Sequence, residues 1–272
     1  MSNSDKQRFT VLFDYDSLIY KAVYRIVSVG QMRDWFKEGK TKEWMRKEII
    51  ALSINRLTNM GDRVLLDIEE TGADVYMVKY YITVCPNSFR RALTDDYKKS
   101  RRQRKYRNRF VSRIRNWLVD MKFAEVNDRF EADDLIADDA RKLNGKAIIA
   151  TMDKDLKQIE GFGFDYYRPI VKDEQGNKIP QPCRGLYHVT ELEAARFFWS
   201  QMLTGDGGDD IKGLHRVGPK TAKKVLDPLK TVSEMEQAVK DLYEKKLGDE
   251  WQEAYDLAYQ LLKLGTDGRN NA

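Results

Sequence analysis

The chain has 272 residues, of which 42% are hydrophobic and 33% are charged, and its net charge is +5. This composition predicts a globular protein of one large domain or two modest ones. No apolar run reaches the ~18–20 residues of a membrane span, residues 1–10 lack the apolar core of a signal peptide, and two cysteines make no disulfide framework or zinc pattern. We therefore expect a cytoplasmic protein without membrane contact.

Short apolar runs alternate with segments of helical periodicity through most of the chain. Strands are expected at Phe9–Phe13, Val75–Val84 and Lys146–Thr151, with a further one at about Phe164–Ile170. Helices are expected from Asp16 to about Val29, from Glu43 to about Glu70, at Phe110–Met121 and from Glu131 onward. Residues 30–42 and 172–182 are expected to be loops, and beyond Thr190 we expect helices only. The alternation predicts an α/β fold with a central, mostly parallel sheet flanked by helices.

Acidic residues gather in three short stretches, Glu131-Ala-Asp133-Asp134, Asp153-Lys-Asp155 and Asp206-Gly-Gly-Asp209. Clustered carboxylates raise each other's pKa unless a cation neutralises them, and oxygen-only clusters suit Mg²⁺ or Mn²⁺. Asp14 and Asp153 follow predicted strands directly, where ligands of open α/β sheets bind. The stretches therefore predict a shared metal site.

Each stretch also has a simpler interpretation. The acidic residues at 131–134 could merely complement a helix dipole. The segment at 206–210 could be an ordinary loop, but it is no EF-hand, because Ile211 and Val217 stand where that motif needs glycine and glutamate. Neither alternative explains the aspartates at both strand ends.

A basic strip runs from Arg90 to Arg115, with 12 basic residues against two acidic ones. Its net charge of +10 leaves the rest of the chain at −5, because the whole chain is +5. Such a strip on an acidic body is typical of a protein that holds a polyanion, although runs of like charge are often solvated tails. Gly218 and Pro219 then form a turn into a lysine-rich helix whose start could bind a phosphate or could simply connect two helices.

Taken in order, these motifs resemble the flap endonuclease/5′→3′ exonuclease family, particularly its compact bacteriophage members. The resemblance rests on Phe13-Asp14, Phe89-Arg90, Tyr97-Lys98-Lys99-Ser-Arg101 and the three acidic stretches, and it extends over nearly the whole chain. It implies a PIN-like/5′ nuclease fold with a nuclease core at 1–189, a helical arch at about 86–115 and a helical DNA-binding region at 190–272. A helix-hairpin-helix motif is expected at about 211–226, with a K⁺ ion there.

The resemblance also implies a two-metal phosphodiesterase with Mg²⁺ or Mn²⁺ ions ~3.5–4 Å apart. First-site ligands would be Asp14, Glu131 and Asp133. Second-site or water-mediated ligands would be Asp134, Asp153, Asp155, Asp206 and Asp209. The residues expected to be catalytic are Lys98, Asp14, Asp134 and Asp153, with Lys98 contacting the scissile phosphate.

The expected DNA contacts include Tyr20, which would stack on a terminal base, a contact worth ~1–3 kcal/mol. The other expected DNA-binding residues are Arg90, Tyr97, Lys98, Lys99, Arg101, Arg102, Val217, Gly218, Lys220 and Thr221. The substrate would be DNA with a 5′ flap or 5′ end, or an RNA–DNA hybrid, cut in phage-type replication or repair. We expect a monomer that works beside replication proteins.

Three positions depart from the family pattern. Cys85 stands where an aspartate is usual, Tyr15 where a glycine commonly follows the first aspartate, and Arg216 at the first glycine of the hairpin. A neutral thiol is a poor Mg²⁺ ligand. Two other functions stay open: a PIN-like ribonuclease, and a non-catalytic nucleic-acid-binding protein whose carboxylates are structural.

Overall fold

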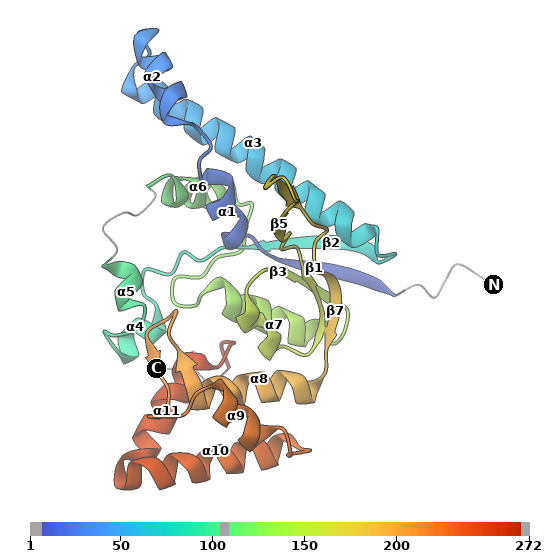
Figure 1. Ribbon diagram of the computed structural model, residues 1–272, viewed down its shortest axis with the longest axis vertical. Helices are drawn as coiled ribbons and strands as arrows, with labels where there is room; N and C mark the ends of the chain where they lie inside the picture. The colour runs from blue at the N-terminus through green and yellow to red at the C-terminus, as the bar shows by residue number, and fades with distance from the viewer. Residues whose placement is uncertain (1–6, 104–108, 268–272) are drawn as a thin grey trace, which may run out of the picture.

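The computed structural model describes residues 7–103 and 109–267 and shows three layers, with a sheet between two groups of helices (Figure 1). The strands are β1 (Arg8–Asp14), β2 (Asp74–Tyr81), β3 (Ala147–Thr151), β4 (Gly161–Asp165), β5 (Ile170–Lys172), β6 (Lys178–Pro180), β7 (Gly185–Val189), β8 (Gly205–Asp206) and β9 (Ile211–Lys212). The α-helices are α1 (Asp16–Val23), α2 (Val29–Lys37), α3 (Lys42–Glu69), α4 (Phe89–Leu93), α5 (Lys99–Arg102), α6 (Arg109–Asp120), α7 (Ala132–Leu143), α8 (Glu191–Thr204), α9 (Pro219–Leu226), α10 (Val232–Leu247) and α11 (Trp251–Leu262). Two short 3₁₀ helices are η1 (Lys154–Gln158) and η2 (Gly248–Glu250).

The main sheet has five strands in the order β2-β1-β3-β4-β7. Its first four strands are parallel, and β7 pairs antiparallel with β4. This confirms the predicted α/β fold with a mostly parallel sheet. In such a sheet the parallel strands all end at one edge, so the segments that follow β1 and β3 are brought together there.

Alternation along β1 builds a core on each face of the sheet. Val11 and Phe13 pack with α1, α3 and α6 on one face. Leu12 points to the other face and packs with α7. A third apolar cluster joins α8, α9, α10 and α11, and Tyr97 from the basic strip is buried in it. The strip is thus held to the C-terminal helices by an aromatic side chain.

Several local predictions were wrong. Residues 172–182, expected as a loop, contain β6, which pairs with β5. Residues 30–42, expected as a loop, contain α2, which Ser28 begins by accepting a hydrogen bond from the Gln31 backbone N–H at 3.0 Å. The helix expected to reach Val29 instead ends at Val23. The region beyond Thr190 was expected to hold helices only, yet β8 pairs there with β9. The antiparallel strand β7 was also missed.

The packing of Tyr15 explains why this position holds a bulky residue where the family pattern has a glycine. Its ring is buried among Phe13, Tyr80 and Phe123, and its hydroxyl donates to the Leu57 carbonyl of α3 at 3.4 Å. A Cβ atom on Gly61 would lie 2.8 Å from that hydroxyl. The bulky residue after Asp14 is therefore matched by a glycine in the facing helix.

We expect Gly61→Ala to lower the free energy of unfolding by about 1–2 kcal/mol, because overpacking outweighs the gain in helix propensity. Urea denaturation measures this. The same substitution in a Tyr15→Phe background should cost less, and Gly30→Ala in α2, where the nearest atom is 3.7 Å away, is the matched control. Equal effects at positions 61 and 30 would contradict the pairing.

Candidate metal centre and nucleic-acid interface

The first carboxylate of the site stands at the end of β1. Asp14 is buried, and its Oδ2 atom accepts hydrogen bonds from Thr151 Oγ1 at 2.8 Å and from Ser17 Oγ at 3.2 Å. Burial raises the pKa of Asp14 to about 7, and the charges of Asp16 and Asp153 add to the effect. The Asp14 carboxylate therefore experiences a repulsion that a bound cation would relieve.

Helix α7 brings its acidic N-terminus to the same sheet edge. Glu131 is the N-cap residue of α7, and Asp133 lies in its first turn. The pKa of Asp133 is raised well above its ordinary value by burial and by the nearby charges of Asp14 and Asp153. Complementing a helix dipole requires no second or third buried carboxylate, so the dipole alone does not account for this arrangement.

The remaining carboxylates come from η1 and from the loop between β8 and β9. Burial raises the pKa of Asp155 to about 7, with the charges of Asp153 and Asp206 as further causes. Gln201 of α8 donates a hydrogen bond to Asp155 Oδ1 at 2.8 Å. The pKa of Asp209 is also raised by burial, although Lys98 and Arg101 oppose the shift. The structure thus brings all three acidic stretches and Asp14 into one electrostatic cluster.

Two glycines form the base of the loop that carries Asp206 and Asp209. A Cβ atom on Gly205 would lie 2.3 Å from the backbone nitrogen of Gly213. A Cβ atom on Gly213 would lie 2.1 Å from the Thr204 carbonyl carbon. Because neither backbone segment can withdraw from the β8–β9 ladder, only glycine fits at both positions.

Cations of the basic strip reach into the carboxylate cluster. Lys98 Nζ lies 2.7 Å and 2.8 Å from the two Glu131 carboxylate oxygens and 3.4 Å from Asp209 Oδ2. Arg101 Nη2 lies 3.0 Å from Asp209 Oδ1. Burial alone would raise the pKa of Glu131, but Lys98 and Arg90 hold it below its ordinary value.

The backbone fixes Lys98 in this position. Its φ angle is 52°, in the left-handed region that a lysine rarely adopts. Its backbone N–H donates to the Asp209 carbonyl at 2.8 Å. An unfavourable backbone conformation that is held by neighbouring contacts is typical of functional sites.

The donor chemistry of the cluster fits hard divalent cations, since its candidate ligands are carboxylates. Burial and neighbouring carboxylates raise the pKa values of Asp14, Asp133 and Asp155, so a cation at the sheet edge would stabilise the charged form of each group. Within residues 7–103 and 109–267, no three His, Cys, Asp or Glu side chains form a preformed cage around one ion. The cluster therefore gathers candidate ligands for divalent cations without holding them in a preformed cage.

Curated relatives show sequence similarity over about two thirds of the chain. The flap endonuclease Xni of Shewanella halifaxensis is 29% identical over 187 residues, 66% of this chain and 71% of that protein. The Xni protein of Shewanella piezotolerans is 28% identical over 192 residues, 68% of this chain and 72% of that protein. The chain is similar in sequence to curated flap endonucleases of the 5′ nuclease family. No family model matches it. Among solved structures, zinc-bound T5 5′-exonuclease gives a TM-score of 0.49 at 13% identity, covering 94% of this chain and 100% of that chain.

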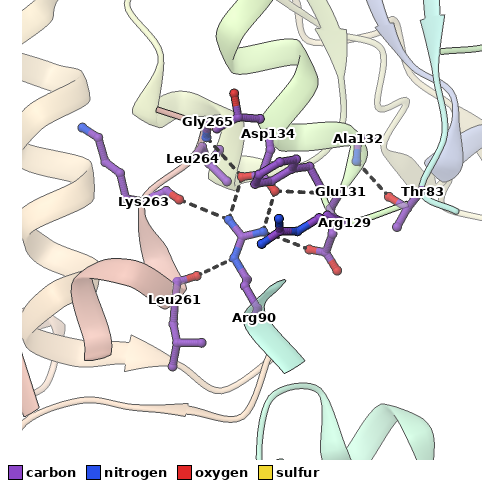
Figure 2. A network of polar contacts seen from close by, with 12 residues as sticks. Thr83, Arg90, Arg129, Glu131, Ala132, Asp134, Leu261, Lys263, Leu264 and Gly265 are labelled. Atoms are coloured by element: carbon purple, nitrogen blue, oxygen red, sulfur yellow. Dashed lines mark hydrogen bonds and ion pairs between the residues drawn. The ribbon is translucent and has the colours of Figure 1, made fainter. Parts of the chain in front are cut away.

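Asp134 does not face the carboxylate cluster as the family motif led us to expect. Its two oxygens accept hydrogen bonds from the guanidinium of Arg90 at 2.6 Å and 2.7 Å, and its side chain is fully buried (Figure 2). It also accepts from the backbone N–H groups of Glu131 and Gly265. We therefore correct its predicted role from metal ligand and catalytic residue to a structural one.

Three predicted DNA contacts are also corrected, because their side chains are buried. Arg90 and Tyr97 are each 2% exposed, and Val217 packs in the C-terminal core. The Tyr97 hydroxyl donates to Glu131 Oε2 at 2.8 Å, so this residue supports the carboxylate cluster. Basicity and aromaticity alone could not separate these buried residues from surface contacts.

Other predicted DNA contacts do lie on the surface. Tyr20 is 56% exposed on α1, six residues after Asp14, with the Arg115 guanidinium 5.6 Å from its ring centre. Lys99 and Arg101 are exposed on α5, and Arg102 is partly exposed there. At the start of α9 the exposed residues are Gly218, Lys220 and Thr221. Arg104, Lys105 and Arg107 of the basic strip lie outside the described residues.

Sequence reasoning missed the polar residues that support the carboxylates. Thr151 and Ser17 donate to Asp14, and Gln201 donates to Asp155. Asp16 accepts from the Thr83 backbone N–H and pairs with Arg115 at 2.8 Å, which ties α1 to α6. Only Thr151 carried a usable signal, as the polar residue that ends an apolar strand.

Cys85 lies near Glu131, whose charge acts on its thiol. Burial raises the pKa of its thiol to about 11, with the charge of Glu131 as the next cause. The thiol is therefore neutral at physiological pH, and a neutral thiol is a poor ligand for Mg²⁺.

We expect Cys85→Asp to lower the Mg²⁺ concentration for half-maximal DNA cleavage by about tenfold, because it adds a carboxylate beside Glu131. A metal titration of cleavage rate measures this. Cys85→Ser is the control and should leave the midpoint near that of the wild type. An unchanged midpoint in the aspartate variant would show that position 85 does not face the ions.

In EDTA, stability should fall as the pH rises. The pKa values of Asp14 and Asp155, about 7 in the folded chain, exceed the ordinary 3.8. Between these values the folded chain binds more protons than the unfolded chain, so the free energy of unfolding decreases with rising pH.

Thermal unfolding between about pH 5 and 7.5 measures this decrease. Asp155→Asn should reduce the decrease, and Mg²⁺ should reduce it in the wild type, because the ion takes the place of the protons. Asp241→Asn, on the exposed surface of α10, should leave the profile unchanged. Parallel profiles for Asp155→Asn and the wild type would contradict the assigned repulsion.

Proposed function

We propose that this protein is a divalent-metal-dependent 5′ nuclease that hydrolyses phosphodiester bonds of DNA, acting as a 5′→3′ exonuclease, a flap endonuclease or both. The observation that carries the proposal is the convergence of Asp14, Glu131 and Asp133 with the later acidic stretches beneath Lys98. Sequence similarity to curated flap endonucleases supports the same activity.

The proposed ligands fall into two groups along the sheet edge. Asp14, Glu131 and Asp133 would hold one ion, and the four carboxylates of the later stretches would hold the other. These four are Asp153, Asp155, Asp206 and Asp209. Two divalent ions so held activate water and stabilise the charge of an in-line transition state.

The surrounding residues would bind and orient the DNA. Lys98 and Arg101 bring positive charge to the cluster and would contact the scissile phosphate region. Tyr20 would stack on a base beside the cluster. The backbone N–H groups at the start of α9, near Lys220, suit a phosphate of the duplex. We assign the nuclease core to residues 1–189, with Asp206 and Asp209 completing its metal site, and duplex binding to the rest of residues 190–272.

No described helix is both long enough and apolar enough to cross a membrane.

A nuclease with the proposed activity would meet its substrate at nicks, flaps and 5′ ends, in replication or repair. An RNA–DNA hybrid would be a further substrate, since the proposed chemistry attacks the phosphodiester and does not need the sugar.

The test is digestion of a 5′-labelled flap, a nicked duplex, an RNA–DNA hybrid and single-stranded RNA, with Mg²⁺ or with EDTA. We expect Mg²⁺-dependent cleavage of the flap or the 5′ end. Asp153→Asn should lower kcat by more than about 100-fold. This loss exceeds the roughly 10- to 100-fold loss that is usual when a residue that only supports a metal ligand is replaced. DNA binding should be kept or tightened, because one negative charge facing the DNA is removed.

Asp241→Asn on α10 is the matched control and should cut like the wild type. Preferred cleavage of single-stranded RNA would favour the PIN-like ribonuclease. Binding of flap DNA without cleavage of any substrate would favour a non-catalytic protein and overturn the proposal.

A further inference from the structure

A buried arginine lies where the basic strip meets α7. Arg90 is on α4 and only 2% exposed, among the most buried large side chains of the described chain. Its Nη1 and Nη2 atoms donate to the two oxygens of Asp134 at 2.6 Å and 2.7 Å. This is the two-pronged geometry that a guanidinium forms with a carboxylate and that an ammonium cannot reproduce.

The same guanidinium also binds the end of α11 and the segment that follows it. Arg90 Nε donates to the Leu261 carbonyl at 2.8 Å, and Nη2 donates to the Lys263 carbonyl at 3.1 Å (Figure 2). The Gly265 backbone N–H donates to Asp134 Oδ1 at 3.1 Å. Segments separated by as many as 173 residues in sequence therefore meet at one ion pair.

Further contacts fasten this C-terminal segment, residues 261–266, to the core. Thr266 donates to Asp138 of α7 through its hydroxyl and its backbone N–H. Arg141 donates to the Leu264 carbonyl at 3.0 Å, and the Leu264 side chain is buried in the cluster under α7. The segment is therefore a fixed support and can hold Arg90 in one orientation.

The ion pair is directly connected to the proposed nuclease site. Asp134 Oδ2 accepts a hydrogen bond from the Glu131 backbone N–H at 3.1 Å, and Arg90 Nη1 lies 3.6 Å from Glu131 Oε2. Glu131 in turn binds Lys98 and Tyr97. A shift of Arg90 would thus move the Glu131 carboxylate and the lysine that it holds.

We propose that Arg90, held by Asp134 and by residues 261–266, is a positioning residue that keeps Glu131 and Lys98 aligned in the nuclease site. The inference rests on the proposed function. Burying both charges costs desolvation energy, and an apolar pair is often as stable or more stable. The ion pair therefore contributes a fixed geometry more than it contributes net stability.

Arg90→Lys tests the proposal, because it keeps the positive charge and removes the two-pronged hydrogen bonding to Asp134. We expect kcat on flap DNA to fall about 10- to 100-fold, the usual range for a residue that orients a ligand. KM should stay near the wild-type value, since Arg90 is buried away from the DNA. The control is Arg141→Lys, which contacts the same C-terminal segment without touching Asp134 or Glu131.

A second readout needs neither metal nor DNA. Cys85 is partly buried beside Glu131, so its labelling rate by a thiol reagent in EDTA, in a Cys183→Ser background, reports the packing there. We expect faster labelling in Arg90→Lys and an unchanged rate in Arg141→Lys. If the wild type cuts no substrate, the proposed function fails, and this rate still decides whether Arg90 aligns the cluster.

The double variant Arg90→Met/Asp134→Asn covers the case in which Arg90→Lys unfolds, because it leaves no unpaired buried charge. We expect it to fold and to keep the reduced kcat and the faster labelling. A folded Arg90 variant with wild-type kcat and labelling would overturn the proposal. So would a kcat loss that disappears on cooling in step with refolding, since that loss would reflect stability alone.

Discussion

Repulsion among buried carboxylates is the constraint on which this structure depends. Burial raises the pKa values of Asp14, Asp133 and Asp155, and the nearby charge of Asp153 raises all three further. A fold optimised only for stability would separate such groups, because each buried charge needs a partner. Here the parallel strands and the N-terminus of α7 concentrate them, which is the arrangement that a site for divalent cations requires.

The rest of the chain meets this constraint with cations and hydrogen-bond donors. Lys98 and Arg101 approach from the basic strip, while Thr151 and Gln201 bind single carboxyl groups. Asp134, in contrast, is withdrawn from the cluster by Arg90 and the C-terminal segment. Two neighbouring aspartates of one motif thus have opposite roles, one exposed to the cluster and one anchoring the helix that presents it.

Much of the sheet and of the carboxylate set was predictable from the sequence, because β1, β3 and α7 carry continuous or periodic apolar patterns beside their acidic ends. Helix α2 was missed because Gly30 and Gly39 are residues typical of loops. Strand β7 was missed because its sequence, Gly-Leu-Tyr-His-Val, lacks the continuous apolar run of a buried strand such as β3. The roles of Arg90 and Tyr97 were not predictable, since they depend on contacts with distant segments that no local pattern encodes. Burial in the tertiary structure, not residue type, determines the roles of these two residues.

The most direct test of the account is the position of Mn²⁺ ions, measured by anomalous scattering from crystals grown with the metal. The account predicts density between Asp14, Glu131 and Asp133, and a second ion among the carboxylates of residues 153–155 and 206–209. Both ions should lie on the side of α7 away from Asp134. Manganese bound elsewhere, or at Asp134 with Arg90 displaced, would contradict the claim that this sheet edge is the metal centre.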